Sequence, residues 1–293
     1  MPAPDNIRAR RSVLYVPASN AKALAKLSEL TPDVVIFDLE DAVAPEQKAE
    51  AREALRAHFK AAGPASYERV IRINPVLGDW GTEDLLAACA CRPDAILLPK
   101  IDTPRDILEV DDALDEADAD IALWAMIETP RAILNLGPLA EFGRDRAARM
   151  KCFVAGTNDL AKETGVAVTP DRRYLAPYLA QIVVAARAVG LDAIDGPLND
   201  FNDAATFAAQ CAEAVNMGFA GKTLIHPSQI AEANRAFAPS ADSIAQATKI
   251  LAAFALPENA GKGVIAIDGR MVERLHLVQA EHLLAKAATI KGA

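Results

Sequence analysis

The alternation of two kinds of segment along the chain constrains the fold more than any other feature. From Ser12 to about Ile225, short runs rich in β-branched residues are each followed by an alanine-rich segment with helical spacing of its apolar residues. This order is typical of repeated strand–helix units around a parallel sheet. The eight runs that we interpret as strands are Ser12–Val16, Val34–Leu39, Arg69–Ile73, Ala95–Leu98, Ile121–Ile127, Cys152–Ala155, Ala193–Asp195 and Lys222–Ile225.

Eight strand–helix units within about 230 residues predict a TIM (β/α)8 barrel, a fold of the α/β class. An open doubly wound sheet usually carries a glycine-rich first turn, and the chain has no GxGxxG motif. The triplet Gly221-Lys222-Thr223 lacks the earlier glycine of a phosphate-binding loop, and it enters a predicted strand instead of opening a helix. We therefore exclude a nucleotide-binding loop.

The pattern changes after the last predicted strand. Pro227, Pro239 and Pro257 interrupt the chain, Gly261-Lys262-Gly263 precedes a short apolar run, and an amphipathic helix is expected from Glu273 to about Thr289. We expect residues 1–235 to form the catalytic barrel and residues 236–293 to form a C-terminal lid.

Charge and composition exclude several classes of protein. The formal net charge is -9 and the pI is about 5.1, so the surface repels nucleic acid and anionic membranes. The four cysteines have neither metal-ligand spacing nor the pairing pattern of a disulfide scaffold. The N-terminal residues have no apolar signal region, and no apolar run is long enough to span a membrane. We expect a cytoplasmic protein with reduced thiols.

Polar residues collect at the ends of the predicted strands. Because all strand ends of a barrel open on one face, residues distant in the sequence should converge there around one pocket. The residues in question are Glu40 and Asp41 after the second strand, Arg72 at the third, Lys100 after the fourth, Glu128 after the fifth, and Asp159, Asp195 and His226 at the last three.

Three of these residues predict a specific chemistry. Glu128 and Asp159 supply two carboxylates, which together with water and substrate oxygens suit Mg²⁺. Arg72 offers a rigid fork for a carboxylate or a developing enolate. Each has a structural alternative: Glu128 pairs with a nearby arginine, Asp159 caps the helix that begins near Leu160, and Arg72 pairs with Glu40 or Asp41. His226 precedes a proline, and we interpret it as a structural donor.

Seven segments, in order along nearly the whole chain, resemble the citrate lyase beta-subunit-like branch of the HpcH/HpaI aldolases, which includes malyl-CoA and citramalyl-CoA lyases. The segments that carry this resemblance are Arg11–Pro17, Val35–Val43, Arg72–Pro75, Ala125–Pro130, Gly156–Ala161, Asp195–Pro197 and Gly221–Pro227.

The resemblance implies a role for each residue at the strand ends. By it, Glu128 and Asp159 are the two protein ligands of Mg²⁺, and Arg72 binds the substrate oxygens. Glu40 and Asp41 support metal-bound waters. The same resemblance therefore selects the positions that the strand-end pattern selects.

The resemblance implies that residues near the first and the last predicted strands bind the CoA portion of the substrate. The family's contacts map onto Tyr15 and Lys26 near the first strand and onto Ile225 and His226 at the last. The chain departs from some malyl-CoA lyases in having Asn20 where they have arginine, and it has Ala18 where glycine is usual. These changes affect the contacts expected for the CoA phosphates.

The C-terminal segment is implied to complete the active site of a neighbouring copy. Members of the family are commonly trimers in which an acidic residue follows a Met-Ile or Met-Val pair, and here Met271-Val272 precedes Glu273. Many relatives have aspartate at this position, so Glu273 keeps the charge and moves it by about one methylene.

The resemblance implies a Mg²⁺-dependent carbon–carbon lyase that cleaves or forms a 3-hydroxyacyl-CoA of the malyl-CoA or citramalyl-CoA type, with acyl-CoA and a 2-oxoacid as the fragments. The implied assembly is a homo-oligomer, a trimer or a dimer of trimers. Three alternatives stay open: a malyl-CoA-type thioesterase in which Glu273 helps a water attack, the beta subunit of a citrate lyase complex, and an inactive relative. The candidate acids differ by methyl groups, each worth only about 1–3 kcal/mol of discrimination. The candidate catalytic residues are Asp41, Arg72, Glu128, Asp159 and Glu273.

Overall fold

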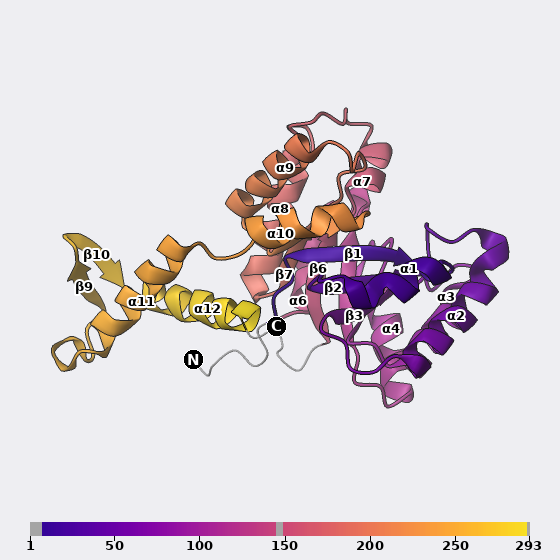
Figure 1. Ribbon diagram of the computed structural model, residues 1–293, viewed down its shortest axis with the longest axis horizontal. Coiled ribbons are helices and arrows are strands. Elements are labelled where there is room, and N and C mark those ends of the chain that lie inside the picture. Colours follow the sequence, from indigo (N-terminus) through magenta and orange to yellow (C-terminus); the bar gives the residue numbers. More distant parts are fainter. Residues whose placement is uncertain (1–7, 145–148, 292–293) are drawn as a thin grey trace. The chain divides into compact units, whose positions relative to one another are not determined.

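The computed structural model describes residues 8–144 and 149–291 and divides the chain into two compact units (Figure 1). One unit is Arg10–Phe237, and the other is built around residues 238–291.

The first unit contains a closed parallel barrel in which each strand pairs with the next and the eighth pairs with the first, Ser12 opposite Lys222. The predicted TIM barrel is confirmed, and each predicted strand lies within two residues of the observed bounds. The strands are β1 (Ser12–Pro17), β2 (Val34–Asp38), β3 (Glu68–Arg72), β4 (Ala95–Leu98), β5 (Ala122–Ile127), β6 (Met150–Ala155), β7 (Asp192–Asp195) and β8 (Gly221–Leu224).

Helices surround the strands in the order that the alternating pattern predicts (Figure 1). Glycines with positive φ end three of them at Gly165, Gly190 and Gly218, where side chains with a Cβ would be strained. In the described part of the chain, no helix is both long and apolar enough to cross a membrane. The helices of this unit are α1 (Ala21–Lys26), α2 (Lys48–Ala61), α3 (Gly81–Cys91), α4 (Pro104–Glu116), α5 (Pro130–Leu134), α6 (Leu136–Glu141), α7 (Thr157–Thr164), α8 (Ala176–Val189), α9 (Ala204–Met217) and α10 (Ile230–Ala236).

Strand periodicity decides which residues reach the mouth of the barrel. Residues such as Ile36, Val70 and Met126 pack in the barrel interior, while their neighbours pack against the helices. Because side chains alternate along a strand, the residue two positions further on also faces inward. Those residues are Asp38, Arg72 and Glu128, so three charged side chains lie at the C-terminal ends of three strands.

The opposite end of the barrel is closed by an arginine. The Arg10 guanidinium donates to both carboxylate oxygens of Glu68, at 2.7 and 2.9 Å, and to Asp192 at 2.7 Å. Its Cζ also lies 5.0 Å from the ring centre of the buried Trp124. These contacts join residues from β3, β5 and β7 and stabilise the N-terminal end of the barrel.

The second unit is a helical pair with a small hairpin. Helices α11 (Ala241–Ala255) and α12 (Arg274–Lys291) pack together, and β9 (Val264–Ile267) pairs antiparallel with β10 (Arg270–Glu273). Asp268 and Gly269 both have positive φ, as a two-residue Asp-Gly hairpin turn requires. The apolar run after residue 263 is thus a strand. The expectation that the last helix includes Glu273 is wrong, because Glu273 ends β10.

Candidate active site

Residues from seven of the eight strand ends line one cavity of about 280 Å³ at the mouth of the barrel. The lining mixes carboxylates, one guanidinium and small residues, so a compact polar ligand fits it better than a large apolar one. The lining residues are Tyr15, Asp38, Asp41, Ala42, Arg72, Met126, Glu128, Ala155, Gly156, Thr157, Asn158, Asp159, Pro197 and Ile225.

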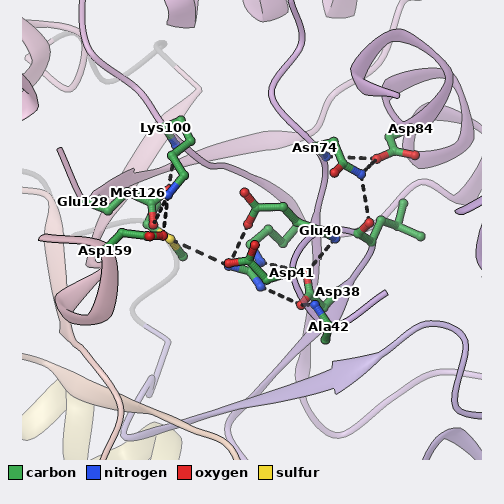
Figure 2. A network of polar contacts seen from close by, with 12 residues as sticks. Asp38, Glu40, Asp41, Ala42, Asn74, Asp84, Lys100, Met126, Glu128 and Asp159 are labelled. Atoms are coloured by element: carbon green, nitrogen blue, oxygen red, sulfur yellow. Dashed lines mark hydrogen bonds and ion pairs between the residues drawn. The ribbon is translucent and has the colours of Figure 1, made fainter. Parts of the chain in front are cut away.

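Arg72 is held in a fixed orientation by a carboxylate that the sequence patterns did not single out. Its Nε and Nη2 donate to the two oxygens of Asp38, at 2.7 and 2.6 Å. Its Nη1 lies 2.8 Å from Glu40 Oε2 and 3.8 Å from Asp41 Oδ2. The expected pairing with Glu40 or Asp41 is therefore present, but the two-bond pairing with Asp38 fixes the plane of the guanidinium. Nη1 is left directed toward the remaining acidic groups and Met126 (Figure 2).

Glu40 is a buried carboxyl that favours its protonated form. Burial raises its pKa to about 8, against the opposing effect of Arg72 and with a further rise from Glu128. Although Oε2 is close to Arg72, it makes no well-directed hydrogen bond to any described residue. The neutral acid reduces the number of anions that face Arg72 at neutral pH.

A second layer of polar contacts fixes the loop after β2. The Lys48 ammonium donates to the carbonyl oxygens of Leu39 and Glu40, at 2.7 and 2.8 Å, and to Asn74 Oδ1 at 3.0 Å. Asn74 in turn donates to the Leu39 carbonyl and to Asp84 (Figure 2). These contacts orient the backbone that carries Glu40. They could not be predicted from the strand pattern, because they depend on a lysine ten residues beyond the end of β2.

Glu128 and Asp159 lie side by side, as the metal-site hypothesis expects, and a lysine joins them. The backbone N–H of Lys100 donates to Glu128 Oε1 at 2.8 Å, and its ammonium lies 3.7 Å from Glu128 Oε2. The same ammonium makes a short hydrogen bond to Asp159 (Figure 2). The alternative pairing of Glu128 with an arginine is wrong, because its cationic neighbour is Lys100. The alternative cap role of Asp159 is also wrong, because Gly156 is the cap of α7.

The two carboxylates differ in their proton affinity. Burial raises the pKa of Glu128 to about 7, although Lys100 opposes the rise. Burial also tends to raise the pKa of Asp159. There, however, the hydrogen bond and the charge of Lys100 outweigh burial, and the pKa is lowered. Burial also lowers the pKa of Lys100, but its bond to Asp159 and the charge of Glu128 outweigh this and raise it. Lys100 is therefore charged across the physiological range.

The space between these groups fits a small cation. A Cβ placed on Gly156 would come within 2.4 Å of Glu128 Cβ and 2.7 Å of Glu128 Oε2, so only glycine permits this approach. Within residues 8–144 and 149–291, no group of three or more His, Cys, Asp or Glu side chains is arranged to hold a metal. Two carboxylates completed by water and substrate oxygens are a ligand set that suits Mg²⁺. An ammonium bonded to Asp159 and 3.7 Å from Glu128 shows that this position attracts positive charge.

The residues predicted for CoA binding divide into two groups. Tyr15 and Ile225 line the cavity, and burial raises the pKa of the Tyr15 phenol. Lys26 is exposed at the end of α1, and the half-buried His226 stacks on Phe201 with 4.4 Å between ring centres; neither is among the lining residues. His226 caps a short 3-10 helix through Nδ1, in agreement with its structural interpretation. Asn20 caps α1 by accepting from the Ala23 N–H.

Two other predicted residues lie apart from the cavity lining. Asp195 is fully buried and accepts from Lys222 at 2.6 Å and from Arg172 at 2.8 Å. Arg172 also pairs with Glu213, so this cluster contains equal numbers of opposite charges. Glu273 belongs to the second unit, where its backbone N–H donates to His276.

The comparisons with known proteins agree with the family that the sequence resembles. Residues 11–227 match the sequence model of the HpcH/HpaI aldolase/citrate lyase family. A (3S)-malyl-CoA thioesterase from Cereibacter sphaeroides is 42% identical, over 96% of this chain and 95% of that protein. The mitochondrial citramalyl-CoA lyase of Homo sapiens is 31% identical, over 96% of this chain and 86% of that protein.

A solved structure extends the agreement to the fold. The protein CitE from Mycobacterium tuberculosis, crystallised with magnesium, acetoacetate and coenzyme A, has a TM-score of 0.74 and 29% identity. The match covers 94% of this chain and 97% of that chain. Together with the family match, this confirms the resemblance on which the sequence analysis relied: the chain belongs to the HpcH/HpaI aldolase/citrate lyase family.

Proposed function

We propose that the protein is a Mg²⁺-dependent enzyme that hydrolyses a malyl-CoA-type thioester. The observation that carries the proposal is the convergence of Arg72, Glu128 and Asp159 on one small cavity. The cavity suits the short acid end of such a thioester, which carries a carboxylate, a hydroxyl and the thioester carbonyl. The 42% identity to a malyl-CoA thioesterase supports this substrate class.

Glu128 and Asp159 are the residues that would hold Mg²⁺. When bound, Mg²⁺ supplies a Lewis acid for the substrate oxygens. The magnesium in the crystals of CitE, a protein 29% identical to this chain, supports the same assignment.

The chain's own residues supply the remaining chemistry. Arg72, fixed by Asp38, directs N–H groups toward the position of a substrate carboxylate or a developing oxyanion. Asp41 is 68% exposed and lines the cavity, so it is placed to accept a proton from an attacking water. In hydrolysis the water oxygen bonds to the thioester carbon, the C–S bond breaks, and the CoA sulfur leaves and takes up a proton.

Carbon–carbon cleavage is the second candidate. It is favoured by the 31% identity to a citramalyl-CoA lyase. The same groups would serve it: a base removes the hydroxyl proton, the oxygen becomes the carbonyl of the 2-oxoacid as the carbon–carbon bond breaks, and the electron pair passes to an enolate that takes up a proton to give acyl-CoA. The two reactions differ in whether the C–S bond survives. We place hydrolysis first because the identity to the thioesterase is higher.

One assay separates the two reactions. The purified protein is supplied with malyl-CoA, citramalyl-CoA and methylmalyl-CoA in Mg²⁺, and free thiol, 2-oxoacid and hydroxyacid are followed together. Hydrolysis releases equal amounts of CoA and hydroxyacid without 2-oxoacid. Accumulation of 2-oxoacid without free thiol would establish the lyase instead. No turnover of any free thioester would revive the interpretation as a subunit of a citrate lyase complex.

Glu273 remains a prediction of the sequence, and its substitution tests its role. We expect Glu273→Gln to lower kcat about a hundredfold, since a positioned acid or base contributes roughly 10²–10⁴-fold, while Glu281→Gln in the following helix should leave kcat unchanged. The oligomeric state is measured in the same samples by light scattering after size exclusion, with a trimer or a dimer of trimers as the predicted result. An unchanged kcat in Glu273→Gln would remove this residue from the mechanism.

A further inference from the structure

We propose that Lys100 is a positioning residue of this site, whose ammonium holds Glu128 and Asp159 together and competes with a divalent cation for their oxygens. The inference rests on the metal part of the proposed function. It adds a function for a third side chain that neither the strand-end pattern nor the resemblance assigned.

The contacts of Lys100 reach both carboxylates at once. Its backbone N–H binds one oxygen of Glu128, and its ammonium lies 3.7 Å from the other oxygen and bonds to Asp159 (Figure 2). A cation placed between Glu128 and Asp159 would therefore meet the ammonium at the same oxygens. Since like charges repel, the lysine must weaken divalent binding unless it withdraws.

The backbone at Lys100 is unusual in a way that points to a function. Its φ of 51° lies in the left-handed region that favours glycine. Leu98, two residues earlier, packs on the helix side of β4, so strand alternation alone would direct residue 100 away from the mouth. The left-handed turn breaks this alternation and brings the side chain to the carboxylates.

The surroundings leave room for the ammonium to move. Lys100 is 30% exposed and also lines a second cavity of about 130 Å³. The lining of that cavity includes Asp106 and Glu109. A second cavity with acidic residues in its lining thus borders the side chain of Lys100, as withdrawal of the ammonium from Asp159 would need.

Calorimetric titration of the chelator-treated full-length protein with MgCl₂ tests the inference. The variants are Lys100→Met, which removes the charge, and Lys100→Arg, which keeps it. The matched control is Lys162→Met, which removes an exposed charge from α7 without a bond to either carboxylate. We expect Lys100→Met to lower the Mg²⁺ dissociation constant about tenfold, and the other two variants to change it less than about threefold.

Each outcome decides a separate question. An unchanged or higher dissociation constant in Lys100→Met, with wild-type binding intact, overturns the role of Lys100 and leaves the metal site standing. Absence of Mg²⁺ binding to the wild type overturns the metal site and this inference together. If Lys100→Met does not fold by circular dichroism, Lys100→Gln is titrated in its place and must show the same tightening.

Thermal unfolding gives a second readout that does not depend on turnover. In chelator, Lys100→Met should melt below the wild type, because two adjacent carboxylates lose their shared cation. Mg²⁺ should then raise its melting temperature by more than it raises that of the wild type, since tighter binding to the folded state stabilises more. An equal rise in both proteins would contradict the proposed competition.

Discussion

The two ends of the barrel both carry charged clusters, and they differ in charge balance. At the N-terminal end, Arg10 and Arg187 pair with Glu68 and Asp192, so cations and anions are equal in number. At the mouth, two cations face a larger set of carboxylates, namely Asp38, Glu40, Asp41, Glu128 and Asp159.

This difference distinguishes a structural cluster from a functional one. In the balanced cluster each buried charge has a partner, and the contacts only join strands. At the mouth, burial raises the pKa of Glu40 to about 8 and of Glu128 to about 7, and neighbouring carboxylates add to both rises. Carboxyl groups that burial and neighbouring carboxylates make harder to ionise are typical of functional sites, and a divalent cation bound among them would favour their ionised form.

Removal of one carboxylate from the mouth should have the largest effect. We expect Glu128→Gln to lower Mg²⁺-dependent kcat/KM by at least about a thousandfold, because one of the two charged ligands of the cation is lost. The amide is close in shape to the carboxylate, so the barrel should still fold. Steady-state kinetics in saturating Mg²⁺, together with a Mg²⁺ titration, measure the loss.

Glu116→Gln provides the matched control, since Glu116 is exposed at the end of α4 and distant in sequence from every lining residue. Its activity should equal that of the wild type. Full Mg²⁺-dependent activity in Glu128→Gln would show that the surplus charge at the mouth does not serve a metal.

A substitution at the N-terminal end of the barrel should lower the free energy of unfolding and leave kcat unchanged. Arg10→Met leaves the buried Glu68 without its two hydrogen bonds, and breaking a buried pair in this way costs about 3–5 kcal/mol. Urea unfolding at pH 7 measures the free energy of unfolding. The kcat of the folded fraction should stay close to that of the wild type.

Arg235→Met is the control for the loss of an arginine charge without the loss of a buried ion pair. Arg235 forms an exposed pair with Glu232 in the same helix. Such an exposed pair contributes little to stability, because water screens it. A loss in Arg10→Met no larger than in Arg235→Met, or a fall in kcat of the folded enzyme, would contradict the division between the two ends.

The sequence predicted the barrel well because its strands are buried on both faces. A run such as Val34–Leu39 is apolar at every position except Asp38, and the helices that follow carry their own periodicity, so the two kinds of segment are easily told apart. The mouth residues Arg72 and Glu128 were predictable for a related reason: each ends a run whose preceding alternate residues face inward.

The residues that escaped prediction depend on geometry that periodicity does not encode. Asp38 also ends an inward series, two residues after Ile36, but it was hidden inside an apolar run. Lys100 was expected among the polar residues at the strand ends, but its contacts with both Glu128 and Asp159 were not, because they depend on its left-handed backbone. The hairpin at Asp268-Gly269 was signalled by that dipeptide, yet its strands have four residues each and were too short to stand out.

The smallest effect expected concerns the pH dependence of stability, and it follows from the surplus charge at the mouth. Glu40 has a folded-state pKa of about 8 against an ordinary value of 4.5, so the folded protein binds a proton there that the unfolded chain has lost. The stability that this proton contributes is complete below pH 4.5 and is lost as the pH rises through 8. We expect Glu40→Gln to gain stability relative to the wild type as the pH rises from 5 to 9, because only the wild type loses the contribution of this proton.

Urea unfolding in chelator at several pH values measures this difference, and groups that titrate in both proteins cancel from it. Glu128→Gln is the informative comparison, because its carboxyl has a pKa of about 7 and its gain should be complete nearly one pH unit lower. A difference between Glu40→Gln and the wild type that does not change from pH 5 to pH 9 would mean that Glu40 is ionised in the folded protein. Arg72 would then be neutralised by two carboxylates, and the mouth would be less able to attract an anionic substrate than its geometry indicates.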